Sequence, residues 1–165
     1  MKRLPLSPVS AAIIAFCAWQ STSLWSAWRF SPFDRLGWVA FLIWIIPAFR
    51  PAPTLTPAPV RTNSSTALQS SAIALALLGS LGSLHAICYI ALACSVAALC
   101  AWGIRTSIWL AGATTWMPAF GFVMSQWLPK SPADTATAIS LLRIVTATAA
   151  IAITFLPMPG KEKSQ

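Results

Sequence analysis

Charged residues are scarce in this sequence, and acidic residues are the scarcest. Only 8% of the 165 residues are charged, and three Asp or Glu face eleven Lys or Arg. An ordinary soluble domain carries roughly 25% charged residues. The chain is 57% hydrophobic, which is more apolar surface than a soluble protein of this length can bury. The shortage of charge argues against a soluble domain and predicts that lipid surrounds most of the chain.

Residues that bind metals or cofactors are also few. The one histidine, His85, precedes Cys88 by three positions, and no carboxylate accompanies them. Two such side chains do not make a metal site. Four cysteines lie in apolar runs with no CxxC pair, where a thiol behaves as a small hydrophobic group: Cys17, Cys88, Cys94 and Cys100. We therefore predict no metal, no cofactor and no disulfide.

The net charge of +8 does not indicate a nucleic-acid partner. The Lys and Arg residues stand singly between apolar runs and form no basic patch, whereas nucleic-acid binding needs clustered positive charge. We expect the bilayer itself to be the main partner, together with another membrane protein if the chain belongs to a larger system.

The charges divide the chain into uncharged runs that are long enough to cross a bilayer, which takes about 20 helical residues. Arg61 and Arg105, for example, frame 43 uncharged residues. The pattern predicts an all-α fold, a single polytopic bundle of about six transmembrane helices. The expected spans are 8–28, 32–49, 66–82, 84–103, 106–128 and 132–156, with a Pro-rich linker at 50–65. The uncharged run 4–28 is too long for a secretory signal peptide, so the first span is expected to remain uncleaved.

Ser-Pro pairs mark the expected helix starts. Ser31-Pro32-Phe33-Asp34 and Ser131-Pro132-Ala133-Asp134 each combine an N-capping serine, a proline suited to the first turn and an acid at the positive end of the helix dipole. Ser7-Pro8 has the same first two elements. We also predict a tight helical hairpin turning at 79–83 and a kink at Pro118.

The distribution of Lys and Arg predicts that both termini lie in the cytoplasm, because cytoplasmic loops carry the excess of these residues. The predicted inner side holds Lys2, Arg3, Arg50, Arg61, Arg105, Lys161 and Lys163, and the outer side holds Arg29, Arg35 and Lys130. Tryptophans near the span ends are typical of the two membrane interfaces. Those expected there are Trp25, Trp28, Trp38 and Trp127 outside, and Trp102 and Trp109 inside. This placement corresponds to a multi-pass protein of a bacterial inner membrane.

Arg143 is the residue that lipid alone does not explain. It lies about eleven residues into the last span, and no acid lies within any expected hydrocarbon core. A charge at that depth costs several kcal/mol without water or a partner. Small neighbours at helical spacing, Ala136, Ser140, Ala147 and Ala150, predict that this face packs on other helices. Arg143 and Ser140 are therefore candidates to face an anion or a partner, and a purely structural arginine that bonds carbonyls is the alternative.

Cys94 is the other candidate for chemistry, because it is expected at a depth similar to that of Arg143. A thiolate needs a nearby cation, so this pair would suit a thiol enzyme, whereas apolar surroundings alone would keep the thiol inert.

Three segments resemble the exosortase/archaeosortase family of membrane cysteine transpeptidase-like enzymes. They are Phe30-Ser31-Pro32-Phe33-Asp34-Arg35-Leu36-Gly37-Trp38, the helical pair from Gly79 to Arg105, and Trp116-Met117-Pro118. The resemblance covers about residues 10–130, the part that precedes the family's catalytic cysteine, and so implies a non-catalytic relative or an accessory protein. A rival register places Cys94-Ser95 on the cysteine motif and Arg143 on the arginine, but with Val96 for Gly and Ser140 for Asn.

Three functions follow from these observations. The first is a small inner-membrane protein with a non-catalytic, exosortase-like or accessory role in protein sorting or export. The second is a minimal membrane cysteine protease or transpeptidase that uses Cys94 and Arg143. The third is a membrane bundle that binds a lipid or a peptide.

Overall fold

A computed structural model describes residues 7–49, 60–100, 104–128 and 132–155, which form an all-helical fold, as the sequence predicts. Its α-helices are α1 (Pro8–Gln20), α2 (Ser23–Phe30), α3 (Gly37–Ile45), α4 (Val60–Leu81), α5 (His85–Ala97), α6 (Ile104–Gly112), α7 (Pro118–Ser125) and α8 (Pro132–Phe155). Short 3-10 helices extend three of them: η1 (Ile46–Phe49), η2 (Ala98–Cys100) and η3 (Ala113–Trp116).

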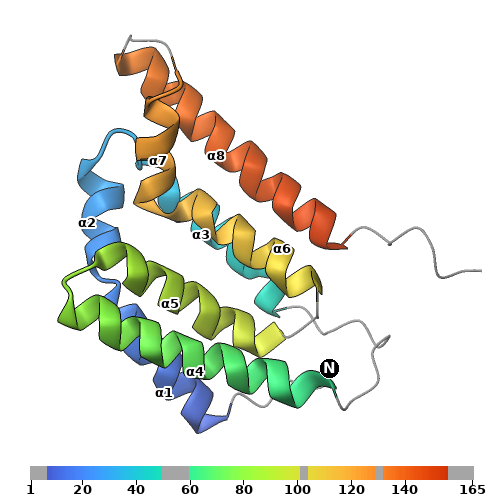
Figure 1. Ribbon diagram of the computed structural model, residues 1–165. Coiled ribbons are helices and arrows are strands. Elements are labelled where there is room, and N and C mark those ends of the chain that lie inside the picture. The colour runs from blue at the N-terminus through green and yellow to red at the C-terminus, as the bar shows by residue number, and fades with distance from the viewer. Residues whose placement is uncertain (1–6, 50–59, 101–103, 129–131, 156–165) are drawn as a thin grey trace, which may run out of the picture.

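The helices form two groups that lie side by side (Figure 1). In the first group α1, α4 and α5 pack on one another. In the second group α8 packs on α3, α6 and η3, and η3 packs on α3. Helix α2 continues the direction of α1 and leads from the first group to the second (Figure 1). Direct packing between the groups is sparser and includes contacts of α5 with α6 and of α2 with α7. The molecule is thus divided lengthwise by a boundary along α5 and α6.

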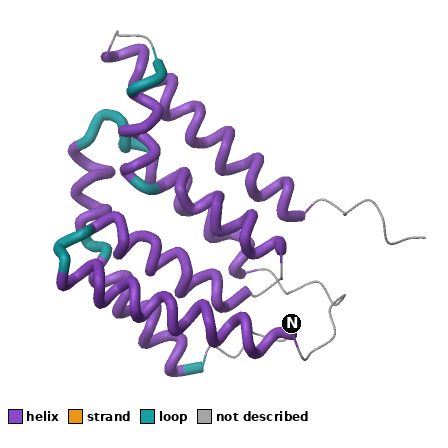
Figure 2. Tube along the Cα trace, viewed as in Figure 1, coloured by secondary structure: helices purple, strands orange, loops and turns teal. Residues whose placement is uncertain are grey.

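Successive segments run in alternating directions along the bundle (Figure 2). The α2–α3 turn, the α4–α5 turn, the end of α7 and the start of α8 lie at one end, which we call the turn end. The start of α1 and the ends of α5 and α8 lie at the other. The described chain therefore begins and finishes at the same end of the bundle.

One helix of the described chain is long and apolar enough to cross a membrane. It comprises Asp134–Thr154, with 21 residues and a mean hydropathy of 1.8. Shorter apolar helices comprise Pro8–Gln20, Gly37–Phe49, Ser65–Leu81 and His85–Ala97. Turns or 3-10 segments divide most of the other expected spans. Helix α4 is continuous over 22 residues, but its apolar part comprises only Ser65–Leu81.

Two of the three predicted Ser-Pro helix starts agree with the structure. Ser7 caps α1 by accepting a hydrogen bond from the Ser10 N–H, and Pro8 is the first helical residue. Helix α8 begins at Pro132 with Asp134 in its first turn. The start at Pro32 is wrong, because residues 32–36 form turns and α3 begins only at Gly37. The Ser31 hydroxyl bonds the Asp34 carboxylate at 2.8 Å instead of capping a helix.

The expected linker ends earlier than residue 65. Helix α4 begins at Val60, because no proline or glycine interrupts residues 60–78 and the polar residues there are compatible with a helix. Residues 50–59 lie outside the described residues.

The predicted hairpin at 79–83 is confirmed. Helix α4 ends at Leu81, Ser83 adopts a φ of 54°, and α5 begins at His85. The Leu84 N–H donates to the Gly79 carbonyl at 2.8 Å and closes the turn. The two helices then pack along their length (Figure 1).

Pro118 interrupts its segment more strongly than the predicted kink. Helix α6 tightens into η3, Met117 is extended with φ −75° and ψ 145°, and α7 starts at Pro118. The missing N–H of proline and its ring prevent a continuous helix here. The break leaves backbone carbonyls free to bond side chains from other helices.

The tryptophans expected near the span ends differ in exposure. Trp25, Trp38 and Trp127 are exposed, but Trp109 is fully buried, and Trp102 lies outside the described residues. Trp109 stacks on Trp44 with ring centroids 4.8 Å apart. Each indole N–H donates to the other residue's carbonyl at 2.8 Å. This pair joins α3 to α6 inside the second group.

Candidate functional site

Arg143 lies on the face of α8 that packs against the other helices of the second group. Thr135, Ile139, Arg143 and Ala147, spaced four residues apart, are all buried. Of the predicted small-residue stripe, Ala147 is buried, whereas Ala136, Ser140 and Ala150 are half-buried. The prediction that Arg143 faces other helices is therefore confirmed.

Arg143 is not an isolated charge. Its Nη2 atom forms an ion pair with Asp34 Oδ1 at 2.5 Å and also donates to the Phe33 carbonyl at 3.2 Å. Its Nη1 atom donates to the Met117 carbonyl at 3.4 Å, and its Cζ lies 5.3 Å from the Phe120 ring centroid. Asp34 lies outside every hydrocarbon core expected from the sequence, yet it pairs with Arg143.

This pairing is possible because α3 and α8 differ in length. Helix α8 has 24 residues, about 36 Å at 1.5 Å per residue, whereas α3 and η1 together have 13, about 20 Å. The turn that carries Asp34 therefore meets α8 about eleven residues from its start. There Asp34 is only 5% exposed and Arg143 is 0% exposed.

Two glycines make room for this ion pair. A Cβ at Gly121 would lie 2.6 Å from Asp34 Oδ1 and 3.0 Å from Arg143 Nη2. A Cβ at Gly37 would overlap the Trp28 indole nitrogen and lie 3.1 Å from Arg143 Nη1. Close approach of backbone to side chain is a regular use of glycine. Both positions thus admit the guanidinium and the carboxylate because they lack a side chain.

The broken helix at Pro118 supplies the remaining acceptors. The Met117 carbonyl accepts from Arg143, and the preceding Trp116 carbonyl accepts from the Trp28 indole at 3.1 Å. Side chains from α2 and α8 thus bond backbone carbonyls at the break. Two buried donors, Arg143 Nε and Trp116 Nε1, have no hydrogen-bond partner within the described chain.

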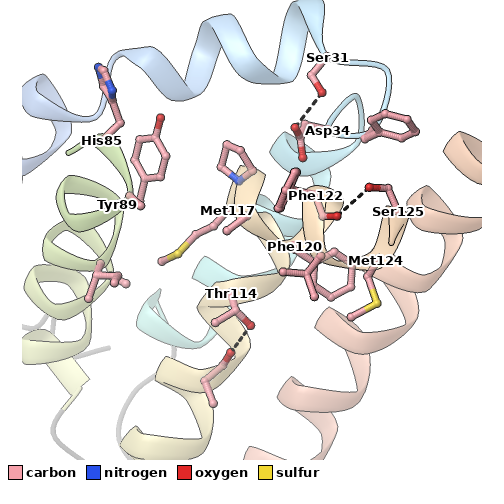
Figure 3. Close-up of a pocket in the computed structure, with 18 of the residues that line it drawn as sticks. Ser31, Asp34, His85, Tyr89, Thr114, Met117, Phe120, Phe122, Met124 and Ser125 are labelled. Atoms are coloured by element: carbon pink, nitrogen blue, oxygen red, sulfur yellow. Dashed lines mark hydrogen bonds between the residues drawn. The ribbon is translucent and has the colours of Figure 1, made fainter. Parts of the chain in front are cut away.

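A large apolar cleft lies beside the ion pair, between the two helix groups. Its volume is about 1390 Å³, above the 300–1,000 Å³ that is usual for drug-sized ligands. His85 and Tyr89 come from α5 on one side, and Thr114, Met117 and Phe122 come from η3, its end and α7 on the other (Figure 3). Exposed lining residues such as Ile90 and Phe122 leave the cleft open along its length.

The polar groups of the cleft gather at the turn end. Ser31 and Asp34 belong to the α2–α3 turn and His85 to the first turn of α5 (Figure 3). Further in, the wall is formed by Ala93, Cys94, Leu110 and Ala111. Thr114 is polar, but its hydroxyl bonds the Ala111 carbonyl of its own helix at 2.8 Å. The cleft is therefore amphipathic along its length.

The structure places the predicted candidates in different positions. Cys94 is 9% exposed and lines the cleft, whereas Arg143 lies behind Asp34 and does not line it. Within the described residues no hydrogen bond or ion pair joins the two side chains. Ser140 donates to the Ala136 carbonyl of its own helix at 2.8 Å. His85 is exposed at the mouth of the cleft.

The comparisons give no family. No family model, curated protein or solved structure matches the chain. The functional argument therefore depends on the ion pair and the cleft.

Sequence reasoning missed Asp34, Met117, Phe120 and Tyr89 as parts of the site. Asp34 could have been found, because it is one of only three acids and the buried arginine needed one. The roles of the other three depend on how the helix groups pack, and no pattern in the sequence indicates that packing.

Proposed function

We propose that this chain is a six-span bacterial inner-membrane protein that holds a lipid-like amphiphile in the cleft between its helix groups. The role is non-catalytic: the protein binds the molecule and does not transform it. The observation that carries the proposal is the cleft itself, which is large, apolar over most of its length and polar at one end.

The outward surface supports placement in lipid. The apolar window of α8 is only 17% buried, and Leu141, Val145 and Ile153 are all more than half exposed. Helices α2 and α4 likewise expose Trp25, Phe30 and Leu78. A soluble protein rarely leaves such extensive apolar surface uncovered, whereas a bilayer covers it.

The course of the chain supports six spans. The alternating segments are α1–α2, α3–η1, α4, α5–η2, α6–α7 and α8 (Figures 1 and 2). Arg29 lies near the end of α2 and Arg35 lies in the α2–α3 turn, so the turn end corresponds to the side predicted to face outward. The inner side holds the larger share of Lys and Arg in the sequence.

The shape of the cleft favours an amphiphile with acyl chains. In a bilayer the open side of the cleft faces lipid tails, so its apolar wall is available to a molecule that enters sideways. The polar mouth at Ser31 and His85 lies where a headgroup would reach the interface. The volume exceeds what a small single-ring ligand needs and suits extended hydrocarbon chains.

The state of Arg143 supports a non-catalytic role. The guanidinium is fully buried and already bonds Asp34, Phe33 and Met117. An activated thiolate needs a cation or a base within reach, and Arg143 is committed elsewhere. Arg143 is also closed to an anionic ligand, so we assign it to the structure that shapes the cleft wall.

Photocrosslinking from inside the cleft tests the proposal. Benzoylphenylalanine would replace Ile90 or Phe122, which line the cleft, and separately Leu141, which is exposed on α8. After irradiation of intact membranes, mass spectrometry identifies the adducts. We expect the two cleft positions to capture one lipid class enriched over the bulk membrane, and Leu141 to capture lipids in bulk proportion.

Adducts of bulk composition at all three positions would contradict specific binding. Recovery of the chain in the soluble fraction of lysed cells would contradict the membrane placement before any crosslink is considered.

The second candidate is an accessory role in a protein-sorting system, as the exosortase resemblance implies. Because Arg143 already bonds Asp34, Phe33 and Met117, this accessory role would be non-catalytic. In this case the cleft would take an apolar helix of another membrane protein, and the Ile90 adduct would be a protein. Copurification in mild detergent would then recover that protein in a stoichiometric complex.

A further inference from the structure

A second recess lies at the α2–α3 turn, and neither Asp34 nor Arg143 lines it. Its volume is about 470 Å³, and two arginines and three tryptophans line it. These residues are Trp25, Trp28, Arg29, Arg35 and Trp38. Four of them are exposed, and Trp28 is half-buried. The recess therefore presents cations and aromatic surface together at the turn end of the bundle.

The two arginines are not neutralised by an acid of the described chain. The nearest carboxylate in sequence, Asp34, is buried and bonds Arg143 and Ser31. It forms the only ion pair within the described residues. The Arg29 guanidinium lies over the Phe30 ring at 5.5 Å, a contact that leaves its N–H donors available. Arg29 and Arg35 thus hold two positive charges in a recess that contains no negative one.

We infer that this recess binds an anionic phosphoryl group, as carried by the headgroup of a phospholipid at the outer membrane surface. Guanidinium N–H donors match phosphate oxygens in paired hydrogen bonds. Tryptophan prefers the level of the lipid headgroups. The recess has both residue types. The tryptophans would hold it at the level of the headgroups, and the arginines would favour a negatively charged headgroup. The lipid source rests on the membrane placement proposed above.

The Trp28 indole connects this recess to the broken helix. Its nitrogen donates to the Trp116 carbonyl at 3.1 Å, and its ring lies 5.8 Å from that of Phe41. The inner wall of the recess is therefore fixed by the second helix group. The arginines come from the end of α2 and from the turn before α3, so a bound phosphoryl group would bridge these two segments.

Native mass spectrometry of the purified full-length chain tests the inference. The protein is titrated with phosphatidylglycerol and with phosphatidylcholine of the same acyl chains. The unsubstituted protein should bind phosphatidylglycerol about tenfold more tightly, and Arg29→Gln/Arg35→Gln should abolish the preference. Arg29→Lys/Arg35→Lys, which keeps the charge and loses the planar fork, should retain part of it.

The matched control is Arg61→Gln/Arg105→Gln, which removes the same charge from positions assigned to the opposite side. It should keep the preference. An equal loss in both double variants would overturn the inference, because general charge attraction would then explain binding. An unchanged preference in Arg29→Gln/Arg35→Gln would overturn it as well.

Inorganic phosphate at constant ionic strength distinguishes the two sources of the phosphoryl group. Displacement of phosphatidylglycerol by phosphate, and not by chloride, assigns the recess to phosphate itself. Failure to displace assigns it to the intact headgroup. The crosslink from position 90 separates this inference from the proposed function. The proposed function predicts that the cleft adduct persists in Arg29→Gln/Arg35→Gln. If that adduct persists but the unsubstituted protein shows no preference for phosphatidylglycerol, only the recess assignment fails.

Discussion

Asp34 and Arg143, 109 positions apart in the sequence, form a buried ion pair that joins the α2–α3 turn to the middle of α8. The pair also fixes the position of the helix break, because Arg143 bonds the Met117 carbonyl as well. It thus ties three separate segments of the second helix group together. The cleft wall formed by Ser31, Phe33, Asp34 and Met117 depends on this arrangement.

Removing one partner of the pair should destabilise the fold strongly. Asp34→Asn or Arg143→Met each leaves a buried charge uncompensated, which costs about 3 to 5 kcal/mol. The double variant should be less destabilised than either single one. Free energies of unfolding from denaturation in mixed micelles, arranged as a double-mutant cycle, measure this coupling.

Ser140→Ala serves as the control for this cycle, because its hydroxyl bonds only its own helix, and it should change stability by about 0.5 kcal/mol or less. Additive losses for Asp34→Asn and Arg143→Met would show that the pair does not interact.

The Trp44–Trp109 pair should be the most sensitive aromatic contact in the described chain. Trp44→Phe retains a ring but removes the N–H that bonds the Trp109 carbonyl, and we expect a loss of about 1 to 2 kcal/mol. Trp25→Phe, at an exposed tryptophan, should lie within about 0.5 kcal/mol of the unsubstituted protein. Thermal unfolding in detergent measures both. Equal losses of stability in Trp44→Phe and Trp25→Phe would contradict the hydrogen bond from the Trp44 indole to Trp109.

Much of the fold follows from the sequence, because helix starts and turns are local. Ser7-Pro8 and Pro132 begin helices where capping chemistry predicts, and the Gly79–Ser83 segment turns as expected. The predicted helix start at Pro32 is wrong, because residues 32–36 form turns and the Ser31 hydroxyl bonds the Asp34 side chain. The same residues can make a cap or a turn, and tertiary contacts decide which.

The site was less predictable than the fold. A charge in an apolar run makes Arg143 conspicuous in the sequence, but its partner Asp34 lies in the distant α2–α3 turn, and the lengths of the helices decide which level of α8 that turn meets. Trp109 was placed at an interface because it lies near a span end. Its burial depends on Trp44, 65 positions away, and no local pattern records that contact.

The orientation proposed above predicts which positions react with a membrane-impermeant maleimide on intact cells. A cysteine in place of Gln126, exposed at the turn end, should be labelled from outside. A cysteine in place of Ser7, at the start of α1, should be labelled only after the cells are opened. The unsubstituted protein gives the background, and its Cys17, Cys88 and Cys94 are buried. The reverse pattern would invert the orientation and contradict the inside placement of the termini.

The most direct test of the cleft is to fill it. Ala111 is exposed on the cleft wall and Ala149 is exposed on α8 outside it, so Ala111→Trp and Ala149→Trp add the same bulk in the two places. The quantity measured is the yield of the enriched lipid adduct from benzoylphenylalanine at position 90. The account predicts a severalfold fall with Ala111→Trp and no change with Ala149→Trp. An undiminished adduct in Ala111→Trp would contradict binding in the cleft.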